Sequence, residues 1–176
     1  MNKMIKKLSV LALISISSTA FAGNLDPNSA VFGTGVVYRV VDGDTMIVTA
    51  DSRGVYDQLK GAATKNKEKK HFNDKYGSFK VRIGNINTPE SVHRNQAKNT
   101  VEGKYASDYV KKNWEKQEVS FVCWDFGHYG RPICSLSSNG IDLGADLIEK
   151  GYSTYEYKWG KHPFLHSMYM KKMMEK

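Results

Sequence analysis

The sequence of 176 residues has little of what would place it in several large protein classes. Its four prolines and 15 glycines show no regular period, which excludes a collagen-like chain. It has no internal repeat, so solenoids are excluded, and its two cysteines cannot form an ordinary zinc site by themselves. With 40% hydrophobic and 25% charged residues it is not a disordered chain. Length and composition together predict one compact domain.

Long apolar runs are missing beyond the N-terminus. Residues 1–22 begin with three lysines, continue with an apolar run from Leu8 to Ile16 and end in Ala20–Ala22. This pattern is typical of a cleavable secretory signal, and the run is shorter than the roughly 20 residues that cross a bilayer. We therefore expect no membrane span after signal removal and a periplasmic or extracellular protein. An uncleaved anchor is the alternative.

Acidic residues are in the minority. The formal charge is +8, and removal of the lysines in the signal lowers it to +5. Seven lysines and only two acids lie between Lys60 and Lys80, which is a local excess of +5. Such a patch suits a polyanion, so we expect it to raise affinity for nucleic acid through phosphate contacts. A solvated lysine-rich loop is the alternative.

Alternating and β-branched residues predict five strands. The first two flank Asp42-Gly43, which is a strong signal for a tight turn, and form a hairpin. The last two form a second hairpin. The expected strands are residues 36–41, 45–49, 78–86, 119–124 and 132–136.

The two cysteines lie in the second hairpin. Counting from the centre of its turn sets Cys123 opposite Cys134, and Phe121 opposite Leu136, on one face. A register shifted by one residue is the alternative. An exported chain with an even number of cysteines permits a disulfide between them.

Helical periodicity or helix-stop signals mark three further segments, residues 101–117, 143–150 and 163–176. Residues 23–32 are expected to be a flexible lead-in, 33–176 the domain, and 51–77 a lysine-rich insertion with room for a short helix near Tyr56–Ala63. The order of elements predicts an α+β fold, a small five-stranded β-barrel with three helices packed outside it.

Two acids flank the tip of the first hairpin. Asp42 and Asp44 are two residues apart and can converge on one side of the turn. Oxygen ligands on a rigid turn suit Ca²⁺ or Mg²⁺. Because Asp-Gly is also a good turn sequence, a turn without metal is the alternative.

Glu90 and two arginines follow or end other predicted strands. Pro89 restrains Thr88 to an extended conformation and so holds Glu90 in a loop of fixed direction, where its carboxylate can act as a general base on water. Arg82 and Arg131 can grip a phosphodiester and stabilise its more charged transition state. Each residue taken singly is also compatible with an ordinary surface role.

These residues carry a resemblance to a known family. Three motifs in this order resemble the staphylococcal (micrococcal) thermonuclease family over most of residues 33–170: Val41-Asp42-Gly43-Asp44-Thr45, Arg82 followed by Asn87-Thr88-Pro89-Glu90, and Tyr129-Gly130-Arg131. The resemblance implies an OB-fold, calcium (or Mg²⁺ or another divalent metal), and hydrolysis of DNA and RNA to 3′-phosphate products.

The resemblance also implies roles for the metal-binding residues. Asp44 would bind calcium directly, with Asp42 close behind it and the Thr88 carbonyl as a further ligand. The family usually has a second aspartate where this chain has Asn87. The amide oxygen of Asn87 can still bind calcium, but it adds no negative charge.

The remaining implied roles concern the substrate. Glu90 would position or deprotonate the attacking water, and Arg82 and Arg131 would hold the phosphate. The motif includes Tyr129 as a substrate-binding residue.

A pair of tyrosines flanks the nucleotide in the family. Tyr155 and Tyr157 are the natural match, although the spacing from Gly151 fits Tyr157 and Trp159 almost as well. The family's lysine before Tyr-Gly-Arg is His128 here.

The sequence thus predicts an exported, metal-dependent, sugar-nonspecific nuclease that acts as a monomer on DNA and RNA. The alternative is an OB-fold domain that binds nucleic acid with little or no catalysis, which Asn87 favours. An exported binder of another anionic polymer would rest on charge alone.

Overall fold

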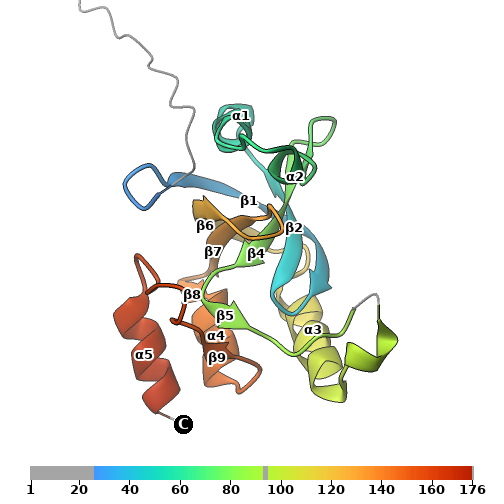
Figure 1. The fold of residues 1–176 in the computed structure, drawn as a ribbon, viewed down its shortest axis with the longest axis vertical. Coiled ribbons are helices and arrows are strands. Elements are labelled where there is room, and N and C mark those ends of the chain that lie inside the picture. Colours follow the sequence, from blue (N-terminus) through green and yellow to red (C-terminus); the bar gives the residue numbers. More distant parts are fainter. Residues whose placement is uncertain (1–25, 93–94, 176) are drawn as a thin grey trace, which may run out of the picture.

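The computed structural model describes residues 26–92 and 95–175 (Figure 1). The predicted signal, residues 1–22, and the start of the predicted lead-in lie outside the described residues. The first strand starts at Val31, near the end of the predicted lead-in.

Five strands close into a barrel, as the sequence predicts. Neighbouring strands run antiparallel in the order β4-β2-β1-β6-β7, and a parallel pairing of β4 with β7 closes the ring. Closure leaves no long unpaired edge among these strands. The strands are β1 (Val31–Asp42), β2 (Thr45–Ala50), β4 (Ser78–Ile83), β6 (Glu118–Phe126) and β7 (Pro132–Ser138).

In the part of the chain that the structure describes, four strands of two residues extend or flank the barrel. β3 (Phe72–Asn73) pairs with β4, and β8 (Ile141–Asp142) pairs with β7. β5 (Ile86–Asn87) pairs with β9 (Thr154–Tyr155), which ties the chain after β4 to the C-terminal segment.

Among the described residues, five α-helices surround the barrel, where the sequence predicted three and a short fourth. α1 and α2 belong to the lysine-rich insertion, and a 3₁₀ helix (Gln96–Lys98) precedes α3. In Figure 1, α1 and α2 lie at the opposite end of the molecule from α4 and α5. The helices are α1 (Arg53–Gly61), α2 (Asn66–Lys69), α3 (Val101–Trp114), α4 (Leu143–Glu149) and α5 (His166–Met174).

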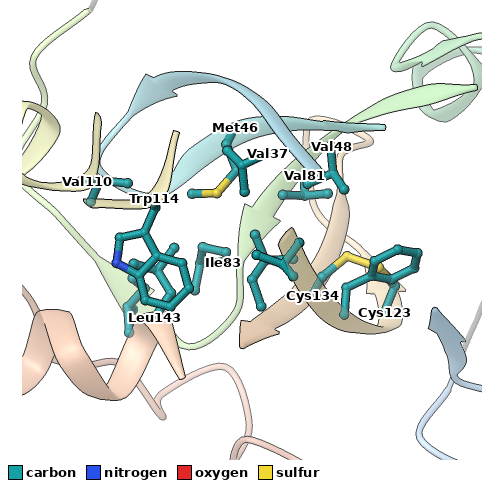
Figure 2. Close-up of a cluster of buried hydrophobic side chains, with 14 of the residues drawn as sticks. Val37, Met46, Val48, Val81, Ile83, Val110, Trp114, Cys123, Cys134 and Leu143 are labelled. Atoms are coloured by element: carbon teal, nitrogen blue, oxygen red, sulfur yellow. A yellow bond between two sulfur atoms is a disulfide. The ribbon is translucent and has the colours of Figure 1, made fainter. Parts of the chain in front are cut away.

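Alternate side chains of the strands fill the barrel (Figure 2). Val110 and Trp114 from α3 and Leu143 from α4 close one end of this core, since all three are buried in one cluster with the strand residues. Burial of each such side chain contributes roughly 1.5–3 kcal/mol. The strand residues labelled in Figure 2 are Val37, Met46, Val48, Val81, Ile83, Cys123 and Cys134.

The hairpin register predicted from the cysteines is confirmed. Cys123 pairs with Cys134 and Phe121 with Leu136, and the cysteines form a disulfide across the strands. A bulge follows between Cys123 and Asp125. The disulfide is therefore part of the hairpin whose turn carries Tyr129 and Arg131.

A buried histidine anchors the C-terminal segment. His162 is 1% exposed, its Nε2 contacts the Ser135 hydroxyl at 2.8 Å, and its Nδ1 accepts hydrogen bonds from the backbone of Phe164 and Leu165. Burial lowers the pKa of His162 to about 4, so the ring is neutral at neutral pH. This anchor fixes the segment between β9 and α5.

Within residues 26–92 and 95–175, the structure has no helix that is long and apolar enough to cross a membrane.

Removal of the disulfide should destabilise the hairpin without changing its register. The cysteines are 11 residues apart, and for a loop of this size the chain-entropy model gives about 3 kcal/mol. We expect Cys123→Ser combined with Cys134→Ser to lower the free energy of unfolding by about that amount, measured in urea. The parent under reducing conditions should show the same loss. A double variant as stable as the oxidised parent would contradict the prediction.

Candidate active site

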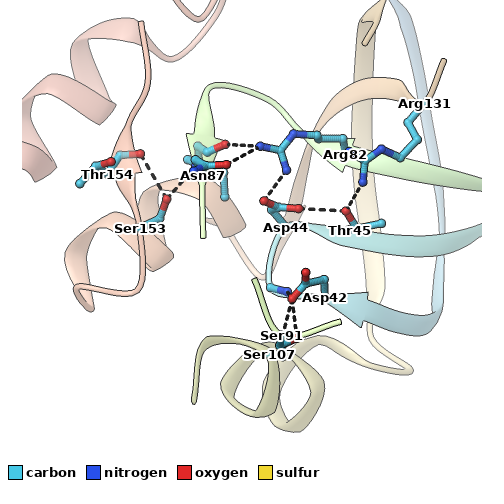
Figure 3. A network of polar contacts seen from close by, with 12 residues as sticks. Asp42, Asp44, Thr45, Arg82, Asn87, Ser91, Ser107, Arg131, Ser153 and Thr154 are labelled. Atoms are coloured by element: carbon cyan, nitrogen blue, oxygen red, sulfur yellow. Dashed lines mark hydrogen bonds and ion pairs between the residues drawn. The ribbon is translucent and has the colours of Figure 1, made fainter. Parts of the chain in front are cut away.

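An ion pair joins β4 to the turn before β2 at the rim of the barrel. Arg82 is the penultimate residue of β4 and lies next to Thr45 of β2, and its Nη1 pairs with Oδ2 of Asp44, the residue before β2 (Figure 3). The Asp44 side chain is only 8% exposed and that of Arg82 25%. Because a buried carboxylate needs a partner, this pairing holds Arg82 at the site.

A second guanidinium reaches the same place through a threonine. The Thr45 hydroxyl donates to Asp44 Oδ1 at 2.9 Å and accepts from Arg131 Nη1 at 2.5 Å. Arg131 immediately precedes β7, whose parallel pairing with β4 brings the two arginines together. The network therefore unites Arg82 and Arg131, which are far apart in the sequence.

The turn after β4 returns the chain to Arg82. Asn85 has a φ of 59°, in the left-handed region that a tight turn uses. The chain then comes back, and Arg82 Nη2 donates to the Ile86 carbonyl at 3.0 Å and to Asn87 Oδ1 at 3.1 Å. Asp44 and Asn87 thus contact the same guanidinium group through different nitrogens.

Asp42 is fixed from a different side. Its Oδ1 accepts hydrogen bonds from the hydroxyls of Ser91 at 2.6 Å and Ser107 at 2.8 Å, and from the Gly43 backbone at 2.8 Å. Ser107 lies on α3, so this carboxylate ties the turn of the first hairpin to a helix. Asp42 is therefore firmly oriented by three hydrogen bonds.

Close backbone packing positions Thr88 and Glu90. A Cβ at Gly43 would lie 2.8 Å from Thr88 Oγ1, and a Cβ at Gly103 would lie 2.3 Å from the Glu90 carbonyl oxygen. That carbonyl also accepts from the backbone of Thr100 at 2.9 Å. The glycines let the loop of Thr88 and Glu90 lie directly on the Asp-Gly turn and on α3.

Several of the predicted acids lie close enough to Arg131 to act on its charge. Burial and the nearby charge of Arg82 lower the pKa of Arg131, and the charges of Asp44, Glu90 and Asp42 oppose this shift. Arg131 still carries its charge at neutral pH, since an arginine does not deprotonate in proteins. The structure therefore brings Asp42, Asp44, Glu90 and both arginines into one site.

The oxygen atoms at the site fit a hard cation. Asp44 Oδ2 and Asn87 Oδ1 already contact one cationic group, Arg82, and the buried Thr88 hydroxyl has no hydrogen-bond partner among the described residues. Carboxylate, amide and hydroxyl oxygens suit Ca²⁺ or Mg²⁺. Within that part of the chain, no group of three His, Cys, Asp or Glu residues could hold a metal. Asn87 contributes an oxygen atom without a negative charge.

The predicted stacking residues differ in exposure. Tyr129 is 70% exposed and Tyr157 50%, so both rings are accessible. Tyr155 is only 4% exposed, its hydroxyl accepts from the His162 backbone, and its ring packs on Tyr169. A base cannot stack on Tyr155 in this structure, which disagrees with the prediction. Trp159, the alternative raised by the spacing, is 88% exposed.

Sequence reasoning missed the residues that orient the site. Ser107 lies 65 positions from Asp42, and its hydroxyl occurs on a helix with no motif around it. Asn85 holds the segment after β9 by donating to the carbonyls of Glu156 at 3.0 Å and Gly160 at 2.8 Å. The Gly84-Asn85 pair is a turn signal that could have indicated this position.

The Gly103 contact predicts a large effect from one methyl group. Gly103→Ala should displace the Glu90 loop and lower the free energy of unfolding by about 1–3 kcal/mol, measured in urea, because the new Cβ overlaps a backbone carbonyl. Gly61→Ala on α1 is the matched control, since nothing lies within 4 Å of its Cβ position. Equal stabilities of the two variants would show that the loop does not rest on α3 as described.

Comparison with known protein families matches residues 80–175 to the family described as staphylococcal nuclease homologue. The matched segment begins in β4 and contains Arg82, Glu90 and Arg131, whereas the Asp42–Thr45 turn precedes it. A comparison with curated proteins found no match. The match covers more than half of the chain, and the closed barrel agrees with the OB-fold of this family. The chain therefore belongs to the staphylococcal nuclease homologue family.

Proposed function

We propose that the protein is an exported, metal-dependent nuclease that hydrolyses phosphodiester bonds of DNA and RNA to 3′-phosphate products. The observation that carries the proposal is the network Arg82–Asp44–Thr45–Arg131, which sets two guanidinium groups beside acidic oxygens on a rigid rim. Family membership supports a nuclease or a nucleic-acid-binding domain. The disulfide is compatible with export.

Two guanidinium groups hold the scissile phosphate. Arg82 exchanges its contact with Asp44 for a phosphate oxygen, because both partners offer anionic oxygens. Arg131 approaches from the turn before β7 and adds a second charge-assisted hydrogen bond. As negative charge grows on the phosphorus oxygens, the two cations stabilise it more than they stabilise the ground state.

Glu90 acts on the attacking water. Its backbone is fixed between Pro89 and α3, and its charge lies in the electrostatic range of Arg131. A carboxylate held in this way accepts a proton from water as the oxygen attacks phosphorus. Water attacks in line with the leaving oxygen: the bond between phosphorus and the 5′-oxygen breaks, the 5′-oxygen leaves with a proton as a hydroxyl, and the phosphate stays on the 3′-oxygen.

Asp44, the amide oxygen of Asn87 and Thr88 are the groups that would hold a divalent cation, with Asp42 behind them. Calcium bound there would supply Lewis-acid activation of the phosphate. Affinity should be lower than with two carboxylates, since ligand charge tunes calcium binding.

Substrate bases have two exposed tyrosines available, Tyr129 and Tyr157. Stacking on an aromatic ring does not depend on the sugar or on the base, which suits action on both DNA and RNA.

A binding domain with little catalysis is the second candidate, and Asn87 is the observation that favours it. The combination of Glu90 with Arg82 and Arg131 favours the nuclease, because binding alone has no need of a water-activating carboxylate.

Replacement of Glu90 should separate catalysis from binding. We expect Glu90→Gln to lower the turnover of single-stranded DNA in calcium by about 10²–10⁴-fold, since it removes the general base. Affinity for the strand, measured in a chelator, should stay close to that of the parent. Glu102→Gln, an exposed acid in the first turn of α3, is the matched control. Parental turnover in Glu90→Gln would refute the assigned role.

A further inference from the structure

The lysine-rich insertion is docked on the turn that carries Arg131. Lys67 Nζ on α2 donates to the His128 carbonyl at 2.7 Å, and His71 Nε2 contacts the Tyr129 carbonyl at 3.0 Å. Gly130 has a φ of 85°, and a Cβ there would lie 2.2 Å from the Lys67 carbonyl oxygen. The insertion (residues 51–77, outside the matched segment) is therefore an ordered neighbour of the site.

Several lysines of the insertion are engaged within it. Lys60 pairs with Asp74 at 2.6 Å, and Lys65 lies 3.6 Å from the buried carboxylate of Glu68. Lys67 is occupied by the docking contact. The net charge of the segment therefore overstates the charge that it offers to a polyanion.

Strand pairing places further basic residues beside the site, on the outside of the barrel. Arg39 of β1 pairs with Ile47 of β2, and Ile47 pairs with Lys80 of β4. Lys80 precedes Arg82 by two residues, so both face outward, about 7 Å apart along the strand. Val81, between them, is buried. Arg39, Lys80 and Arg82 thus share one outer face.

The electrostatics agree with this arrangement. Burial lowers the pKa of Lys80, and the charges of Arg131 and Arg39 lower it further. Burial also lowers the pKa of His71, with contributions from Lys70, Lys80 and Arg131, against the hydrogen bond with Tyr129. Like charges held this close repel one another, and a bound polyanion would relieve that repulsion.

We propose that Arg39 and Lys80 bind the phosphates of a nucleic acid strand that extends beyond the scissile phosphate, and that the docked insertion forms one wall of this phosphate track. The proposal rests on the proposed function in that Arg82 and Arg131 mark where the track meets the cleaved bond. The track contacts the phosphates and not the bases, so its binding does not depend on the base sequence. Because it extends beyond the scissile phosphate, it favours substrates longer than a dinucleotide.

The test measures binding without cleavage. Affinity for a labelled single strand of about 16 nucleotides, long enough to cross an OB-fold, is measured by anisotropy in a chelator between about 50 and 200 mM salt. The variant is Arg39→Gln with Lys80→Gln. The control is Lys150→Gln with Lys171→Gln, which removes the same charge from exposed positions at the α4–α5 end. Thermal melting confirms that both variants fold.

The expected result is a salt dependence that is weaker by about 1.4 in log–log slope in the Arg39/Lys80 variant, since each single-strand phosphate contact contributes about 0.7. The control should keep the parental slope, and a dinucleotide should bind both variants alike. An unchanged slope, an equal loss in the control, or no strand binding by the parent would overturn the proposal. Cleavage is measured separately in calcium: a parent that binds with the expected slope but does not cleave refutes the nuclease and leaves the track standing.

Discussion

The ion pair between Asp44, in the turn before β2, and Arg82 on β4 joins the first hairpin to β4 at the rim of the barrel. Both groups are largely buried, and loss of one partner from such a pair typically costs about 3–5 kcal/mol because a charge is left uncompensated. Thr45 and Arg131 attach to the same carboxylate, and Asn87 attaches to the same guanidinium. The pair therefore stabilises the rim of the barrel. It is also the point where an anionic substrate would compete with Asp44 for Arg82.

Closure of the barrel brings the groups around this ion pair together. The parallel contact between β4 and β7 brings Arg82 beside Ile133, and so brings Arg131 to the rim. The disulfide joins the two strands of the β6–β7 hairpin close to that contact. Lys67 of the insertion binds the turn of the same hairpin. The positions of the two arginines follow from long-range strand pairing and not from any local motif.

Most of the scaffold could be predicted because its signals are local. The period of the strands, the Asp-Gly turn and the count between Cys123 and Cys134 each depend on a few neighbouring residues, and the structure confirms the hairpins and the disulfide. Contacts across the chain could not be predicted in this way. The Ser107 hydroxyl on Asp42 and the burial of Tyr155 depend on how α3 and the C-terminal segment pack. The docking of Lys67 on His128 depends on how the insertion folds back.

We propose that this rim hydrolyses phosphodiester bonds with a divalent cation and two arginines. The most direct measurement is digestion of single-stranded DNA by the mature chain in calcium, in magnesium and in a chelator, with Arg131→Ala beside it. The predicted result is cleavage in calcium that leaves 3′-phosphate ends, stops in the chelator and falls sharply in Arg131→Ala. Binding of the strand without cleavage in any of these conditions would contradict the claim and identify the protein as a nucleic-acid-binding OB-fold.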